Sequence, residues 1–276
     1  MIKFEHTLLA LPFAFLGAVL AAEGLPTWWQ LLWITVAMVG ARSAAMTFNR
    51  IADRDIDAAN PRTAAREIPS GKLSISFAWT FLYASIGLFL LASYLLNWLT
   101  FALSPVALIF ILGYSYAKRY TAFAHIFLGV ALSIAPSAAW IAVRGSLVDE
   151  VPLLLSLLVL MWTAGFDVLY ACQDYEFDRR TGLRSMPAKY GIKNSLRIAR
   201  LFHFQAFIVL IVLYFATDLE SWLALVGVVA VGGLLIYQHS LIKSDDLSRM
   251  NAAFFTTNAF VSVILLLTFG GAVFLR

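Results

Sequence analysis

Nine apolar segments of membrane-spanning length constrain this chain more than any other feature. They lie at about 7–22, 30–50, 75–96, 99–117, 122–143, 152–171, 197–217, 221–239 and 252–274. Because a bilayer offers backbone N–H and C=O groups no partners, only helices and closed barrels span it, and these runs are too long and too continuous for barrel strands. Only 13% of the residues are charged, about half the ~25% of a soluble domain. We therefore predict an all-α polytopic membrane protein and exclude a soluble globule, a disordered chain and a nucleic-acid-binding module.

The distribution of basic residues predicts the orientation of the nine helices. Seventeen of the 20 lysines and arginines fall at the N-terminus or in the loops after even-numbered segments. Since cytoplasmic loops carry an excess of basic residues, we expect a cytoplasmic N-terminus and an external C-terminus in the inner membrane. The first segment could instead be the apolar part of a signal peptide, but the remaining segments would still need an orienting first helix. We therefore treat residues 1–276 as one transmembrane domain in the lipid bilayer.

Two long cytoplasmic loops, 51–74 and 172–196, repeat one pattern and are expected to cap the bundle. The first contains Asp53-x3-Asp57 and then RTxxRxxP at 62–69, and the second contains Asp174-x3-Asp178 and then RTxxRxxP at 180–187. The sequence spacing between the two motifs aligns the second predicted helix with the sixth. The two halves, about 1–120 and 121–276, are therefore predicted to form a parallel repeat. We expect the two acidic clusters to face each other across a central cavity.

Helical spacing separates the acidic side chains into groups. Residues four apart share one face of a helix, so Asn49, Asp53 and Asp57 form one stripe, and the second stripe comprises Asp167, Tyr170, Asp174 and Asp178. Asp55 and Glu176 point away from these stripes. Stacked carboxylates repel one another unless cations neutralise them, and oxygen ligands without sulfur suit Mg²⁺, which takes one or two carboxylates plus substrate phosphates. The predicted metal ligands are Asp53, Asp57, Asp174 and Asp178.

Basic residues beyond each acidic stripe suit a bound polyanion. We assign the following to diphosphate binding: Arg62, Arg66, Lys118, Arg180, Arg184 and Lys189. A set of acids, a metal ion and arginines is typical of diphosphate chemistry. The alternative is that these residues pair with one another at the membrane edge and only set the topology.

Arg42 is the least ordinary residue inside a predicted span. It lies seven residues before Asn49, and an intramembrane arginine normally faces the interior and has a partner. We expect it to bind the carboxylate of an acceptor or the diphosphate, or alternatively to pair with Asp167. Tyr114, four residues before Lys118, is a further candidate at the edge of the site. The histidines 125, 203 and 239 lack metal-ligand spacing, so we interpret them as packing or interfacial residues.

These motifs together resemble the UbiA superfamily of intramembrane prenyltransferases. The resemblance covers nine spans, the Asn49-x3-Asp53-x3-Asp57 and Asp167-x2-Tyr-Ala-x2-Asp174-x3-Asp178 motifs, and Tyr114-x3-Lys118. It implies a Mg²⁺-dependent enzyme that transfers a prenyl chain from a polyprenyl diphosphate to an acceptor. The residues to which it gives catalytic roles are Asn49, Asp53, Asp57, Asp174 and Asp178.

One branch of this superfamily is resembled by Asn49-Arg50 and by the start of the chain, where Lys3-Phe-Glu-His6 precedes an apolar run with Leu11-Pro12-Phe13. That branch is the bacterial 4-hydroxybenzoate polyprenyltransferases, and especially the subgroup assigned to menaquinone synthesis by the futalosine route. The acceptor implied is a small aromatic acid used in ubiquinone or menaquinone biosynthesis. In the 4-hydroxybenzoate enzymes an arginine near the first helix is expected to meet the acceptor, whereas this chain has Lys3 and His6 there. The residues that we expect to bind the acceptor or to support the site are Lys3, His6, Arg42, Tyr114, Asp167 and Tyr170.

Three other functions are compatible with parts of this pattern. A relative with the same fold could use haem, chlorophyllide, homogentisate or a glycerol lipid as acceptor. A cation-binding transporter would carry charged pairs near the membrane midplane, whereas these acids lie at predicted helix ends. A CDP-alcohol phosphotransferase also uses spaced aspartates and Mg²⁺, but its DGxxAR…GxxxDxxxD pattern is absent from the sequence.

Overall fold

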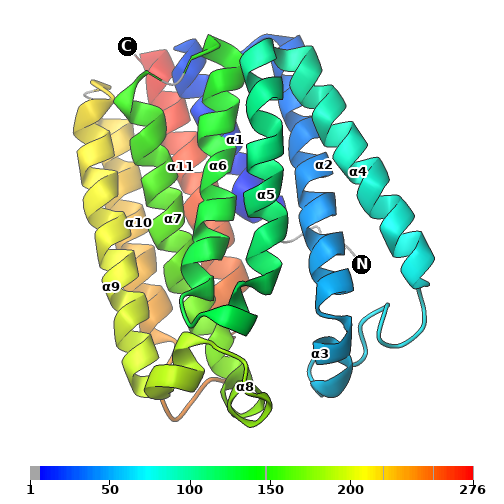
Figure 1. Ribbon diagram of the computed structural model, residues 1–276. Coiled ribbons are helices and arrows are strands. Elements are labelled where there is room, and N and C mark those ends of the chain that lie inside the picture. The colour runs from blue at the N-terminus through cyan, green and yellow to red at the C-terminus, as the bar shows by residue number, and fades with distance from the viewer. Residues whose placement is uncertain (1–6, 147, 220, 251, 276) are drawn as a thin grey trace.

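A computed structural model describes residues 7–146, 148–219, 221–250 and 252–275, and these are almost entirely helical (Figure 1). Within these ranges eight helices are long and apolar enough to cross a membrane, and a shorter apolar helix precedes them. The helices are α1 (Thr7–Ala22), α2 (Trp28–Ala52), α3 (Arg54–Ala59), α4 (Ile75–Leu96), α5 (Trp98–Tyr120), α6 (Ala124–Arg144), α7 (Glu150–Ala171), α8 (Tyr175–Thr181), α9 (Met186–Ala216), α10 (Trp222–Ser240) and α11 (Thr257–Ala272). The predicted all-α membrane fold is confirmed.

The two loops predicted at 51–74 and 172–196 are only partly irregular. Each contains a short helix, α3 in the first and α8 in the second, and α9 begins at Met186, well before the predicted apolar start at 197. Ser185 caps α9 by accepting a hydrogen bond from the amide of Ala188, and Pro187 lies in the first turn. A break at Gly191, where φ is 78°, separates this first turn from the rest of α9.

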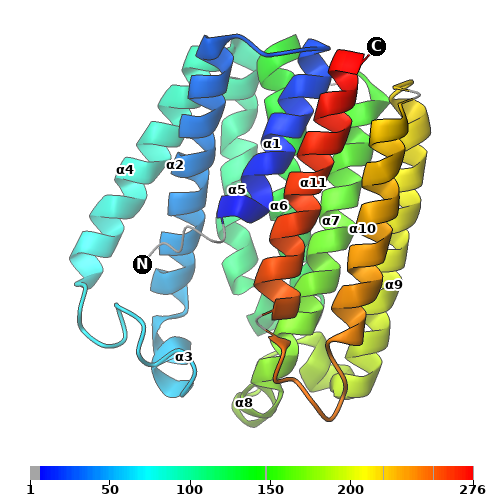
Figure 2. The same ribbon diagram turned by 180° about the vertical axis from the view of Figure 1, so that it is seen from behind.

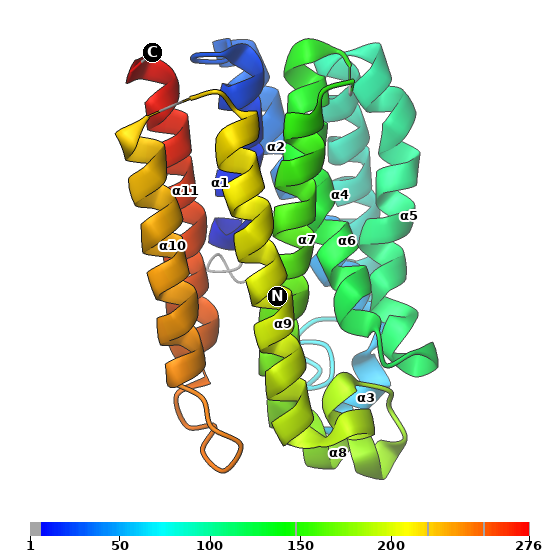
Figure 3. The same ribbon diagram turned by 90° about the vertical axis from the view of Figure 1, so that its left-hand side faces the viewer.

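The long helices run roughly side by side, with α3 and α8 together at one end, which we call the cap end (Figures 1 and 3). The end of α11 lies at the opposite end of the bundle (Figure 2). Trp28, Trp98 and Trp222 begin α2, α5 and α10 at that opposite end and are strongly exposed. Aromatic side chains at this level are typical of a membrane interface.

Helix α1 is an integral part of the bundle, which argues against the signal-peptide interpretation. Phe13 and Leu16 are almost fully buried in the main hydrophobic cluster with Trp162 of α7. A Cβ atom on Gly17 would lie 2.5 Å from the carbonyl oxygen of Pro136, so α1 and α6 are in backbone contact at this glycine. Figure 2 shows α1 between α2 and α11.

Candidate active site

The two acidic motifs adopt the same local structure at the cap end. Asp53 follows α2 with φ −97° and ψ 7°, and Asp174 precedes α8 with φ −97° and ψ 8°. Each aspartate therefore ends a long helical segment and starts a short helix. Those short helices carry the second aspartate of each motif, Asp57 in α3 and Asp178 in α8, and both are buried. The sequence repeat is thus also a repeat of backbone conformation.

The bend at Asp53 leaves the predicted stripe intact. The amide of Asp53 donates to the carbonyl of Asn49 at 2.9 Å, and the amide of Asp57 donates to the carbonyl of Asp53 at 2.7 Å. The side chain of Asn49 also donates to Asp53 Oδ2 at 3.1 Å. Asp55, by contrast, is 88% exposed and contacts Arg54, and Glu176 is exposed. Helical phase correctly separates these two acids from the clusters.

Asp53 is neutralised by cations from the end of α5. Lys118 Nζ lies 2.6 Å from Asp53 Oδ2, and Arg119 Nη2 lies 3.3 Å from Oδ1. Arg119 also donates to the carbonyl of Ala52, the last residue of α2. Because Asp53 is only 2% exposed, these contacts supply the compensation that a buried carboxylate needs.

Asp57 is neutralised from within its own loop. Arg66 Nη1 donates to both carboxylate oxygens, at 2.6 and 2.7 Å. Arg50, on the last turn of α2, lies 3.7 Å away. The hydroxyl of Thr63 donates to the backbone carbonyl of Asp57 at 3.0 Å, so the loop folds back over its own aspartate.

The first loop also crosses to the second motif. Arg62 donates to Asp174 through Nε at 2.8 Å and Nη2 at 2.5 Å, and through Nη1 to the hydroxyl of Tyr170 at 3.1 Å. The side chain of Asn60 adds a bond to Asp174 at 3.0 Å. Burial lowers the pKa of Arg62, but its hydrogen bonds to Asp174 and the charge of that carboxylate together raise this pKa above its ordinary value. These contacts lock the two halves together at the cap end.

Asp178 differs from the other three aspartates. Within the described residues it has no ion pair, although it lies near Asp174 and Lys118 and interacts with the hydroxyl of Ser185. The structure does not bring the remaining assigned cations to the aspartates. Arg184 donates to the carbonyl of Tyr120, Lys189 lies against two aromatic rings, and Arg180 is exposed.

The suggested pair between Arg42 and Asp167 is wrong. Asp167 Oδ2 lies 2.7 Å from Nδ1 of His125, which is buried on α6. The interpretation of His125 as an ordinary packing residue therefore has to be corrected. His203 and His239 contact each other at 2.9 Å between α9 and α10, in keeping with the packing role assigned to them.

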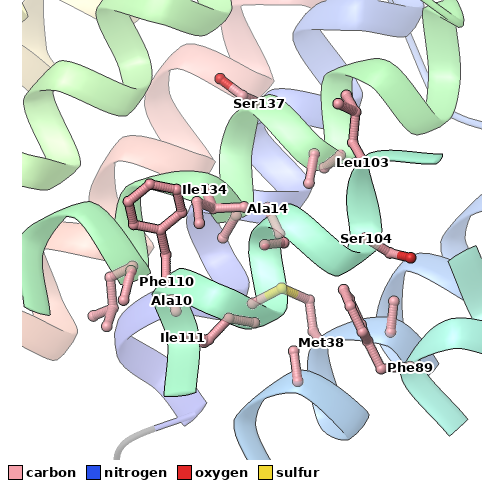
Figure 4. A pocket seen from close by; sticks show the side chains of 18 of the residues that line it. Ala10, Ala14, Met38, Phe89, Leu103, Ser104, Phe110, Ile111, Ile134 and Ser137 are labelled. Carbon is pink, nitrogen blue, oxygen red and sulfur yellow. The ribbon is translucent and has the colours of Figure 1, made fainter. Parts of the chain in front are cut away.

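Arg42 lies in the wall of a largely apolar cavity of about 380 Å³. Residues of α1, α2, α4, α5, α6 and α7 line the cavity, and Figure 4 shows Met38, Phe110 and Ser137 among the lining side chains. Tyr114 lines it as well, and the buried Nε of Arg42 has no hydrogen-bond partner in the described part of the chain. Tyr114 lies one turn, about 6 Å, from Lys118, so the cavity ends just below the cluster of aspartates. Lys3 and His6 lie outside the described residues.

The donor atoms of the site fit Mg²⁺ in type. Over the described ranges no three acidic, histidine or cysteine side chains are close enough together to enclose a metal ion. Magnesium does not need such a cage, because it normally takes one or two carboxylates and completes its shell with phosphate oxygens and water. Each motif offers two carboxylates one helical turn apart, and Asn49 adds an amide oxygen.

Fold and site together define a multi-pass membrane enzyme with paired acid and arginine clusters above an intramembrane cavity. The chain belongs to the UbiA prenyltransferase family, whose model matches residues 10–264. It is similar to a 4-hydroxybenzoate octaprenyltransferase of Aliivibrio fischeri (strain MJ11), with 32% identity over 242 residues that cover 87% of this chain and 82% of the relative. It is an enzyme of the prenyltransferase class.

Two solved structures share the fold. An apo structure of a UbiA homologue from Aeropyrum pernix K1 has a TM-score of 0.88 and 32% identity, and covers 100% of this chain and 99% of its own. A UbiA homologue from Archaeoglobus fulgidus, solved bound to DMAPP and Mg²⁺, has a TM-score of 0.76 and 18% identity, and covers 98% of this chain and 96% of its own. At that identity the second comparison supports the fold alone.

Proposed function

We propose that this enzyme transfers a polyprenyl chain from its diphosphate to a small aromatic carboxylic acid such as 4-hydroxybenzoate, with Mg²⁺ as cofactor, in ubiquinone or menaquinone biosynthesis. The observation that carries the proposal is Arg42, a half-buried cation in the wall of the cavity below the aspartate cluster. Its Nε is buried and has no hydrogen-bond partner among the described residues. An intramembrane guanidinium without a protein carboxylate is suited to a ligand that brings its own anion. Prenyltransferases of the same family from bacteria carry the name of this acceptor.

The diphosphate is expected to bind at the cap end. Mg²⁺, when bound, neutralises the charge that develops on the leaving diphosphate, and Asp53, Asp57, Asp174 and Asp178 are the residues that would hold it. Lys118, Arg119, Arg62 and Arg66 already pair with three of these carboxylates, Asp53, Asp57 and Asp174. They are therefore in place to pair with phosphate oxygens. Arg180, Arg184 and Lys189 stay predictions as diphosphate ligands, because their present contacts lie elsewhere.

The chemical step breaks the bond between the allylic carbon and the diphosphate oxygen. The diphosphate leaves with that electron pair, and a ring carbon of the acceptor attacks the allylic carbon and then loses its proton. Water would quench the cationic carbon, so the site must exclude it. The apolar wall below the aspartates meets this need, since alanine, isoleucine, leucine and phenylalanine side chains make up most of it.

The acceptor and the prenyl tail would use different parts of the cavity. The carboxylate of the acceptor would pair with Arg42, with Tyr114 alongside, close to the end of α5 that carries Lys118. The apolar tail would lie against the remaining wall, where Leu103, Val106 and Phe110 of α5 are each more than a third exposed. This exposure favours entry of the tail from the bilayer along α5.

The active site is expected on the cytoplasmic side of the inner membrane. The cap end carries most of the basic residues, and the positive-inside rule places such an end in the cytoplasm. The described end of α11 lies at the other end of the bundle (Figure 2), so the C-terminus would lie outside and the N-terminus inside the cell.

A membrane assay with labelled geranyl diphosphate and Mg²⁺ tests this function. The acceptors are 4-hydroxybenzoate and its neutral amide, and the variant is Arg42→Gln. We expect a prenylated product with the acid and little with the amide. Arg42→Gln should raise KM for the acid roughly 10- to 100-fold, as expected for loss of hydrogen bonds to a charged group at ~1.5–3 kcal/mol. The absence of Mg²⁺-dependent product with any aromatic acceptor would refute the proposal.

A further inference from the structure

A three-residue segment that leads into α9 and includes its first residue, residues 184–186, makes contacts with both repeat halves. We call it the strap. The amide of Arg184 donates to the carbonyl of Lys118 at 2.8 Å. The hydroxyl of Ser185 caps α9 and interacts with Asp178. The amide of Met186 donates to Nε2 of His125 at 3.3 Å. Each residue of the strap thus contacts a different helix.

His125 connects the strap to the second acidic stripe. Its Nε2 accepts from a backbone amide, which can only donate, so the ring proton lies on Nδ1 and is donated to Asp167 at 2.7 Å. The imidazole is neutral in this arrangement, and both of its nitrogens are used. His125 is 4% exposed and Met186 is 2% exposed, so water does not offer either group a replacement partner.

The contacts of the strap end on residues of the proposed diphosphate site. Lys118 pairs with Asp53 through its side chain while its carbonyl holds Arg184. Asp178, the one aspartate of the two motifs without an ion pair among the described residues, has Ser185 beside it. A shift of the strap would therefore move one group of each acidic motif. His125 is the side chain that holds the third residue of the strap, Met186.

We propose that His125 is a positioning residue that holds Asp167 and the strap in register, so that both acidic motifs keep the spacing needed for Mg²⁺ and diphosphate. This rests on the proposed function. The buried pair of His203 and His239 provides a contrast, because it also bridges helices through imidazole nitrogens but contacts neither acidic motif. A merely structural role would make the two sites equivalent.

Two amides of different length test the proposal. His125→Gln can accept from Met186 with its carbonyl and donate to Asp167 with its amino group, whereas His125→Asn is one methylene shorter and reaches only one partner. Both variants bury an amide at position 125. A difference between them therefore reports on the hydrogen bonds from this position to Met186 and Asp167. His203→Asn serves as the matched control at the other buried imidazole.

Two measurements on the purified full chain are needed. The first is hydrogen exchange of the peptide 183–190, which contains the Met186 amide. The second is the Mg²⁺ concentration that half-saturates the thermal shift produced with inorganic diphosphate, with prenyl transfer measured in parallel. We expect faster exchange and an approximately tenfold higher half-saturating concentration for His125→Asn, the loss of about one hydrogen bond to a charged group. His125→Gln should stay within about twofold of wild type, and His203→Asn should lower thermal stability alone.

The results separate this inference from the proposed function. Equal hydrogen exchange and equal half-saturating Mg²⁺ concentrations in His125→Gln and His125→Asn overturn the proposal that His125 connects Asp167 to the strap. Faster exchange in His125→Asn with an unchanged Mg²⁺ requirement reduces His125 to a structural residue. A wild-type protein that binds Mg²⁺ and diphosphate but transfers no prenyl group refutes the proposed function and leaves the inference standing. A wild-type protein without any Mg²⁺-dependent shift overturns both.

Discussion

Replacement of Arg62 by lysine tests whether the contact between the two halves serves catalysis. Arg62 lies in the first loop and makes two hydrogen bonds to Asp174 and one to Tyr170 of the second motif. Lysine keeps the charge, but its single ammonium group cannot reproduce the planar, forked geometry of a guanidinium. Arg54→Lys is the matched control, because Arg54 also donates to an aspartate, Asp55, in an exposed pair within one helix.

The expected size of the effect follows from the bonds lost. Lysine at position 62 would retain one of the two bonds to Asp174 and lose the bond to Tyr170. A bond to a charged group contributes ~1.5–3 kcal/mol and a neutral one ~1 kcal/mol. About a third of the Arg62 side chain is exposed, so solvent screening reduces the total. We expect a loss of about 2 kcal/mol, or roughly 30-fold in kcat/KM.

The assay is steady-state transfer from geranyl diphosphate to 4-hydroxybenzoate at saturating Mg²⁺. Arg54→Lys should change kcat/KM by less than about twofold, because surface pairs contribute only ~0–1 kcal/mol. Wild-type kcat/KM in Arg62→Lys would refute the reasoning. An equal loss in Arg54→Lys would refute it as well, because the effect would then not depend on the contact between the halves.

Three further predictions concern the acids, the metal and the packing. Asp53→Asn or Asp174→Asn should abolish turnover, while Asp55→Asn should stay within about threefold of wild type, since a surface contact contributes ~1 kcal/mol or less; assays of the three variants in parallel check the helical-phase argument. Removal of divalent metal with EDTA should abolish transfer, and Mg²⁺ but not a monovalent salt should restore it. Gly17→Ala should destabilise the protein by ~1–3 kcal/mol through its clash with the Pro136 carbonyl, while Gly87→Ala, which meets open space, should not; thermal unfolding in detergent measures both.

The bundle and the two acidic stripes are predictable because they depend on local spacing. Length and hydropathy identify a spanning helix, and an interval of four residues identifies one of its faces. The start of α9 escaped this reasoning because its first turns carry Lys189, Lys193, Arg197 and Arg200, which mask the apolar signal. Ser185 and Pro187 are local signals for a helix start at this point. The hydropathy pattern, which places the start near 197, is the stronger signal in the sequence.

The long-range contacts of the candidate site could not be predicted from spacing. Arg62 and Asp174 are 112 residues apart, and His125 and Asp167 are 42 apart. Nothing in the sequence around Asn60 distinguishes it from an ordinary turn residue, although it bonds to Asp174. A histidine has no periodic signature, so His125 became recognisable only when the fold placed it between an acid and a backbone amide.

The charge pairs at the cap end have a consequence for how a substrate would bind. Asp53 and Asp57 are each buried and already paired with a lysine or arginine, and separating a buried pair leaves a charge whose desolvation costs ~3–5 kcal/mol. If metal bound alone, it would displace the lysine and arginines from the carboxylates and leave these cations without an anion. If diphosphate bound alone, it would draw the same cations away and leave the carboxylates without a cation. Together they give each group a new partner, since carboxylates can bind Mg²⁺ while the arginines and the lysine bind phosphate oxygens. We therefore expect metal and diphosphate to bind cooperatively, because the exchange leaves no buried charge unpaired.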